Sequence, residues 1–436
     1  MNRRDFSALL LSLGLGGCGL FDQKKTRLPG ERIAVLGSES DVEADPKLAA
    51  TPVTLPPPSV NAEWAQPGGN PAHDMGHLAL PARLDRAWRT SIGDGSARYT
   101  KVMSQPVIAA GRIFTMDGGV QVSALDPASG DRVWQVDLKP DDQRGSAFGG
   151  GPCFWKNHLY VATGYAEVLA LDPGDGKVVW RQSVSGPVHA PPTVADGRIF
   201  VVTVDNELNA LSVDDGHKLW SHNGIPETAN LLGGASPAIE GEIVIAAYTS
   251  GELFALRVEN GRAVWNENLA STRSANAIAG LADIRGRPVI DRGRVFAVSH
   301  SGRMVAIDLR SGNRVWEQQI SSSHSPWIAG DFVFVLSGDN ELVCLTRNDG
   351  KVRWVRPLQR YEDEEEKSDP ILWAGPVLGG NRLIVLSSTG EAVSVSPATG
   401  ELIGHQDMSS GGYLGPVIAN NALYLLTDDA NLSAYR

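Results

Sequence analysis

Two histidines four residues apart are the first candidates for chemistry in this chain. His73 and His77 lie in the stretch HDMGH, and a helix would align both rings on one metal ion. Pro71 and Gly76 argue against that helix, because proline and glycine both weaken helical structure. We therefore expect both histidines to be structural and predict no metal site.

The other groups that could do chemistry are scattered along the chain. His189, His300 and His324 fall near the expected ends of strands, where a histidine is usually a hydrogen-bonded structural residue. The acidic run YEDEEEKSDP, residues 361–370, lacks the alternation and the glycine of a calcium loop, so we expect a solvated loop. No nucleophile with an adjacent base can be identified. These residues predict a protein that is not an enzyme and that holds no cofactor.

The first cysteine suggests a different kind of chemistry. The opening MNRRDFSALLLSLGLGGCGLF has a basic start and an apolar run, which predict a signal peptide over residues 1–17. The stretch LGGC resembles a bacterial lipobox, in which Cys18 would carry acyl chains such as palmitate. Gly19 is not the aspartate that favours inner-membrane retention, so we expect a lipid anchor on the periplasmic face of the outer membrane. A simple leader with an incidental cysteine is the alternative, and the paired arginines leave both Sec and twin-arginine export open.

The segment after the signal peptide is polar and rich in proline. We expect residues 18–62 to be the lipidated cysteine and a flexible tether, because this composition cannot build a core. Cys153 and Cys344 fall in distant parts of the chain, so we expect two buried thiols and no disulfide.

An internal repeat supplies the elements that must position these residues. The stretch ALDPASGDRVW is followed by ALDPGDGKVVW and by weaker copies, and six of the copies end in tryptophan. A seventh copy, SVSPATGELIG, ends at Gly404 without the tryptophan. A proline that opens a short apolar run recurs in register eight times, at Pro106, Pro152, Pro192, Pro237, Pro288, Pro326, Pro376 and Pro416.

Each repeat has the pattern of four short antiparallel strands, with β-branched and aromatic residues alternating and turns at glycine, proline, aspartate and asparagine. Units of about 40–50 residues with four strands are typical of propeller blades. We therefore predict an all-β fold, a single eight-bladed β-propeller over residues 63–436. The last repeat stops after its third strand, so we expect the strand around Trp88 to complete it and close the ring.

The repeat tryptophans are expected to be buried between neighbouring blades, with a looser contact at Gly404. They are Trp88, Trp134, Trp180, Trp220, Trp265, Trp316 and Trp354. The net charge of −11 without basic clusters argues against nucleic acid as a partner.

The phrase that joins turn and tryptophan resembles the docking motif of the quinoprotein-like propellers, roughly A-x-D-x-x-T-G-x-x-x-W, over nearly all of the chain from Trp88. Two families carry this motif. The pyrroloquinoline-quinone dehydrogenases add a vicinal disulfide, a catalytic carboxylate and calcium ligands, whereas this chain has no Cys-Cys pair. The lipobox, tether and eight blades are similar to the BamB family of outer-membrane lipoproteins.

The resemblance to the BamB family implies a non-catalytic scaffold of the outer-membrane β-barrel assembly (BAM) complex. Such a protein would bind the periplasmic domains of BamA and assist the folding and insertion of outer-membrane proteins, as a monomer within a hetero-oligomer. A periplasmic quinone-dependent dehydrogenase is the alternative, and a propeller that binds envelope glycans in an aromatic-lined channel is a third possibility.

The same resemblance implies that two segments between blades contact BamA. They read ANLLGGASP, from Ala229 to Pro237, and GLADIRGRP, from Gly280 to Pro288. We expect the second segment to project as a ridge in which an apolar residue anchors the partner and flanking charges orient it. The candidate contact residues are Leu231, Leu232, Leu281, Asp283, Ile284 and Arg285. Leu232 stands where the family has an arginine and Arg285 where it has an aspartate, which puts the individual salt bridges in doubt.

Overall fold

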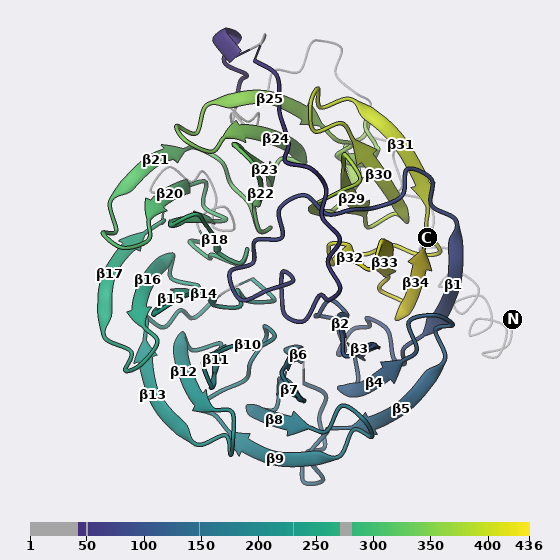
Figure 1. Cartoon of the computed structure of the whole chain (residues 1–436), viewed down its shortest axis with the longest axis vertical. Helices are drawn as coiled ribbons and strands as arrows, with labels where there is room; N and C mark the ends of the chain where they lie inside the picture. The colour runs from purple at the N-terminus through teal and green to yellow at the C-terminus, as the bar shows by residue number, and fades with distance from the viewer. Residues whose placement is uncertain (1–41, 49–50, 148, 230, 271–280) are drawn as a thin grey trace, which may run out of the picture. The chain divides into compact units, whose positions relative to one another are not determined.

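Eight antiparallel sheets of four strands follow one another around a ring (Figure 1). The computed structural model describes residues 42–48, 51–147, 149–229, 231–270 and 281–436. Within these ranges the only helical element is a short 3₁₀ turn, Pro46–Leu48. The predicted all-β fold and the predicted number of blades are both confirmed.

Blades one to four each run from an innermost strand beside the axis to an outermost strand at the rim. Their strands are β2 (Val107–Ala109), β3 (Arg112–Met116), β4 (Gln121–Leu125) and β5 (Arg132–Asp137); β6 (Gly151–Trp155), β7 (His158–Thr163), β8 (Glu167–Leu171) and β9 (Val178–Ser183); β10 (Thr193–Ala195), β11 (Arg198–Val202), β12 (Glu207–Ser212) and β13 (Lys218–Asn223); and β14 (Ala238–Glu240), β15 (Ile243–Ala247), β16 (Glu252–Arg257) and β17 (Ala263–Asn268).

Blades five to eight continue the ring in the same way. Their strands are β18 (Val289–Asp291), β19 (Arg294–Val298), β20 (Met304–Asp308) and β21 (Arg314–Gln318); β22 (Trp327–Ala329), β23 (Phe332–Leu336), β24 (Glu341–Thr346) and β25 (Val352–Pro357); β28 (Trp373–Gly379), β29 (Arg382–Ser387), β30 (Glu391–Val395) and β31 (Leu402–Asp407); and β32 (Val417–Ala419), β33 (Ala422–Leu426), β34 (Asn431–Tyr435) and β1 (Arg86–Ser91).

The eighth blade closes the ring by combining strands from distant parts of the chain. β1 pairs antiparallel with β34, with Trp88 opposite Ala434 and Ser91 opposite Asn431. This pairing confirms the predicted closure, and it covers the strand edge that an open ring would leave unpaired.

Seven tryptophans each join one blade to the next, at every junction except that between blades seven and eight. The indole Nε1 of Trp134, for example, donates a hydrogen bond to the carbonyl of Pro173 in the following blade, at 3.0 Å. The ring also lies over Gly176, where a Cβ would meet the indole at 2.7 Å, so this turn position requires glycine. Equivalent indole hydrogen bonds are made by Trp88, Trp180, Trp220, Trp265, Trp316 and Trp354. Only Trp316 and Trp354 are fully buried, and the other five remain partly exposed.

The missing tryptophan at Gly404 has a topological explanation. Each indole contacts the turn between the third and fourth strands of the next blade. Blade eight has no such turn, because its third and fourth strands, β34 and β1, come from separate parts of the chain. A tryptophan at Gly404 would therefore have no turn to contact, and all six residues of β31 are exposed.

The segment before β1 runs around the ring axis (Figure 1) and contacts the innermost part of every blade. We call residues 61–80 the axial segment. Its backbone or side-chain hydrogen bonds reach, in chain order, blade eight at Ile418, then Ile108, Phe154, Val194, Ile239, Ile290, Trp327 and finally Leu378 in blade seven. These contacts tie all eight blades together at the axis.

The structure corrects the predicted extent of the tether. Residues 51–62 lie against the ring, with the Thr51 carbonyl accepting from Arg353 and the Pro56 carbonyl hydrogen-bonded to His77. The prolines keep this stretch extended, but the ring supplies the hydrogen-bond partners that its composition alone does not reveal. Residues 1–41, which include Cys18, lie outside the described residues.

Candidate functional site

The two inter-blade segments meet at one face of the ring. They precede β14 and β18, the innermost strands of blades four and five. The backbone amide of Leu231 donates a hydrogen bond to the carboxylate of Asp283 at 2.9 Å. The guanidinium of Arg285 lies beside Gly233, where a Cβ would meet its Nε at 2.7 Å. The structure therefore brings together the two segments in which we predicted partner contacts.

Asp283 and Ile284 do not form the exposed ridge that we predicted. Asp283 is 2% exposed and Ile284 is 1% exposed. Ile284 packs in the core between blades four and five, and the Asp283 carbonyl accepts a hydrogen bond from the His300 amide. The ridge prediction is wrong because the blades close over this stretch, a burial that a short sequence without periodicity does not indicate.

Asp283 instead acts as an internal latch between the segments. Its burial raises the pKa of the carboxyl to about 6, although the Leu231 amide and the charge of Arg285 both lower it. The remaining candidates are more accessible: Leu232 is 40% exposed, and Leu231, Leu281 and Arg285 are partly buried. The surface available to a partner is therefore Leu232 and its partly buried neighbours.

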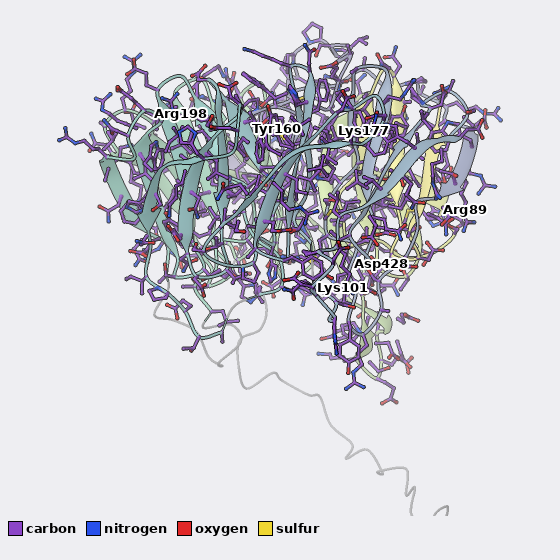
Figure 2. All side chains as sticks on the ribbon, turned by 90° about the horizontal axis from the view of Figure 1, so that it is seen from below. Arg89, Lys101, Tyr160, Lys177, Arg198 and Asp428 are labelled. Atoms are coloured by element: carbon purple, nitrogen blue, oxygen red, sulfur yellow. The ribbon has the colours of Figure 1, made fainter. Side chains whose placement is uncertain are left out.

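A cavity of about 560 Å³ lies on the ring axis next to these residues. Leu231, Leu232 and Arg285 contribute to its wall, and residues of the axial segment, including Trp64 and His73, form its base. Figure 2 shows two further lining residues, Lys101 and Asp428, on the opposite face of the ring from Arg198.

The repeat places the same position of every blade in this cavity. The residue before the innermost strand's register proline, or that proline itself, lines the cavity in all eight blades. In seven repeats the preceding residue is glutamine, glycine, proline or serine, whereas in the fifth it is Arg287. Sequence reasoning missed this arginine, although aligning the repeats on the proline would have identified it.

The histidines that we expected to be structural also converge here. His73, His189, His300 and His324 all line the cavity. Burial and the charges of Arg285 and Arg287 lower the pKa of His324 to about 3. Burial and Arg287 do the same for the pKa of His73, so both imidazoles are neutral at pH 7. His77 lies apart from the cavity-lining histidines, hydrogen-bonded to Pro56 and to the amide of Asn381.

The donor groups of the cavity do not fit a calcium-bound quinone. Asp428 is the only carboxylate among its described lining residues, and burial raises the pKa of this carboxyl to about 6 although the charge of Lys101 opposes the rise. Cys153 and Cys344, which we predicted to be buried thiols without a disulfide, are both buried free cysteines, in blades two and six. The described ranges contain no cluster of three or more histidine, cysteine or acidic side chains arranged to hold a metal ion.

The acidic run forms a small hairpin rather than a loop. β26 (Tyr361–Asp363) pairs with β27 (Ser368–Pro370), and their side chains are exposed apart from a partly buried Tyr361. The hairpin leads into Leu372 and Trp373 at the cavity wall.

No helix in the described ranges is both long and apolar enough to cross a membrane.

Comparison of the sequence with known protein families identifies the family of this chain. A family model described as outer membrane protein assembly factor BamB matches residues 117–356, which is more than half of the chain. This chain belongs to the BamB family. The BamB protein of Yersinia pestis is 26% identical over 253 residues, but the match spans only 62% of that protein and 58% of this chain.

Other BamB proteins extend the similarity. The protein of Shewanella oneidensis is 27% identical over 347 residues, covering 78% of this chain and 85% of its own. The crystal structure of BamB from Moraxella catarrhalis has a TM-score of 0.67 at 20% identity, covering 81% of this chain and all of that one. A quinohemoprotein alcohol dehydrogenase from Comamonas testosteroni gives the same TM-score at 13% identity. At such identities, the two structures share the propeller fold with this chain and support nothing further.

Proposed function

We propose that this chain is a non-catalytic scaffold lipoprotein of the outer-membrane protein assembly machinery. It is held by its lipid at the periplasmic face of the outer membrane and binds the periplasmic domains of BamA, helping outer-membrane proteins to fold and insert. Membership in the BamB family supports the assembly role. The main observation in support of this binding face is the hydrogen bond between the Leu231 amide and the Asp283 carboxylate. It holds the two inter-blade segments together beside the exposed side chain of Leu232.

The Leu231–Asp283 latch is suited to a binding face, because it fixes the surface of this protein that would contact BamA before BamA binds. Ile284 in the core and Asp283 in its hydrogen bonds hold the backbone of the second segment. Leu232 then projects from the first segment as an exposed apolar side chain. Preordered loops lose less conformational entropy on association, so a small patch can still bind a partner tightly.

The test is the affinity for the periplasmic domains of BamA. Leu232→Ala should weaken binding roughly 30- to 1000-fold if this side chain is a dominant anchor, equivalent to about 2–4 kcal/mol. Leu219→Ala is the matched control, because Leu219 is a leucine of equal exposure, 41%, on the outermost strand of blade three. Titration calorimetry on both variants checks the prediction.

One pattern of results would show that the face is wrong. In that pattern, the Leu232→Ala variant binds BamA as well as the wild type does, whereas a variant with the acidic side chains of residues 362–366 replaced by their amides binds BamA more weakly. The non-catalytic assignment has its own check. The protein supplied with pyrroloquinoline quinone and calcium should not reduce a dye with alcohols or sugars, and turnover would favour a dehydrogenase instead.

A further inference from the structure

Arg287 is a partly buried cation with no ion-pair partner among the described residues. It lines the axial cavity, and its Nε is buried without a hydrogen-bond partner among the described residues. Burial lowers the pKa of Arg287 to about 10, so the guanidinium remains charged at pH 7. A buried N–H of a charged group without an acceptor is costly, which makes this position unusual in a folded protein.

Each of the other charged groups that line the cavity has an opposite charge near it. Asp283 lies close enough to Arg285 for each charge to shift the pKa of the other group. Lys101 and Asp428 form a second such pair: burial raises the pKa of Asp428 to about 6, and the charge of Lys101 opposes that rise. Arg287 therefore leaves the described lining of the cavity with an excess positive charge, although the chain as a whole carries −11.

His73 adds a buried acceptor to this buried donor. Its Nδ1 lies 2.7 Å from the carbonyl oxygen of Pro288, which can only accept, so Nδ1 carries the proton. Nε2 is then an acceptor, and it is buried without a partner among the described residues. Pro288 directly follows Arg287, so the His73 ring lies beside the backbone at this arginine, and both residues line the cavity.

We propose that the axial cavity binds a phosphate group between Arg287 and His73. A singly protonated phosphate matches both unpaired groups, because its anionic oxygens accept from the guanidinium and its remaining O–H donates to Nε2 of His73. A carboxylate or a sulfate supplies only acceptors at neutral pH. The cavity is large enough for inorganic phosphate or for a small phosphomonoester, whose monoanion carries the same O–H.

Phosphate binding at this site can be tested on the purified full-length protein without BamA. Titration calorimetry in a phosphate-free buffer compares inorganic phosphate, glycerol phosphate and sulfate. We expect saturable binding at one site for inorganic phosphate, and binding that is at least about tenfold weaker for sulfate. Glycerol phosphate binding as well as inorganic phosphate identifies a phosphomonoester site, and its exclusion identifies a site for the free anion.

Two substitutions show whether Arg287 carries the binding. Arg287→Gln should weaken phosphate binding at least about tenfold, and Arg287→Lys should retain part of it, because the charge remains while the planar fork is lost. Arg198→Gln is the control, since Arg198 begins β11, donates to the carbonyl of Asp196, and lies on the opposite face of the ring from the cavity residues Lys101 and Asp428 (Figure 2). The imidazole signals of His73 should shift on phosphate addition in the wild type. Equal affinity for sulfate and phosphate, absence of saturable binding, or unchanged binding in a folded Arg287→Gln protein would overturn the proposal.

Discussion

At the residue scale, one carboxylate determines how the binding face is held. Asp283 accepts from the Leu231 amide and lies beside Arg285, so it joins two segments that are about fifty residues apart in the chain. Its folded pKa of about 6 lies above the ordinary value of 3.8 because burial disfavours the charged form. The carboxyl of the latch therefore ionises at a higher pH than an exposed aspartate does.

This shift predicts a pH effect with a definite sign. Because the folded pKa is raised, Asp283 contributes stability that is fully present below pH 3.8 and is lost as the pH rises through 6. Asp283→Asn removes this contribution, and it should reduce the fall in unfolding free energy between pH 4 and pH 7 by up to about 3 kcal/mol. Urea unfolding of both proteins at the two pH values measures the difference.

The amide variant should remain folded, because its oxygen can still accept from the Leu231 amide. Asp283→Ala loses that acceptor and should be less stable than Asp283→Asn by about 1–3 kcal/mol at pH 7. An unchanged pH profile in Asp283→Asn would show that the carboxyl has an ordinary pKa and that the latch is already ionised at low pH.

At the element scale, the outermost strands carry the contact from blade to blade. Before each tryptophan the strand bulges by one residue, as between Ala170 and Leu171, which pair with Trp180 and Val178. The extra residue points outward, which explains the exposed Val179 in this strand. The tryptophan is thereby directed at the next blade, where its indole hydrogen bond and the glycine turn hold it.

The tryptophan contacts predict different effects on stability at Trp180 and at Gly404, which occupy equivalent positions in their blades. Trp180→Phe should lower the unfolding free energy by about 1–3 kcal/mol, since it leaves the Val213 carbonyl without the indole donor and removes part of the ring contact. Gly404→Trp should not stabilise the protein, because blade eight has no turn for a new indole to contact. Denaturant unfolding measures both variants, and a clear gain for Gly404→Trp would show that our account of the missing tryptophan is wrong.

The strands and the number of blades could be predicted because their signals are local and repeated. The turn phrase fixes the last hairpin of a blade, and the register proline marks the first strand. The convergence of His73 with Arg287 and His324 could not be predicted from spacing, because His73 lies more than 200 positions before the other two and meets them only in the folded ring. The burial of Ile284 depends in the same way on two blades packing together.

At the scale of the whole molecule, the axial segment makes the ring a single unit. It hydrogen-bonds to every blade, and at Val194 the side chain of Gln66 both donates to the carbonyl and accepts from the amide. Residues of the same segment also line the cavity. The proposed binding face and the proposed phosphate site are therefore both positioned by the axial segment. Its sequence showed none of this, because the contacts are mainly to the backbone of distant strands.

The attachment of the whole molecule to the membrane is expected to depend on Cys18 alone. Each buried methylene of an acyl chain contributes about 0.8 kcal/mol, so several chains on one cysteine hold a protein firmly, whereas a single chain binds only marginally. Cys18→Ala should therefore move the protein from the membrane fraction to the soluble periplasmic fraction, without changing its fold. Cys344→Ala is the control, because this thiol is buried in β24 and its loss leaves the lipobox intact. Fractionation after high-salt and carbonate washing, followed by immunodetection, measures both variants. If Cys18→Ala stays with the membrane after these washes while Cys344→Ala behaves as wild type, the anchor is not the lipid on Cys18.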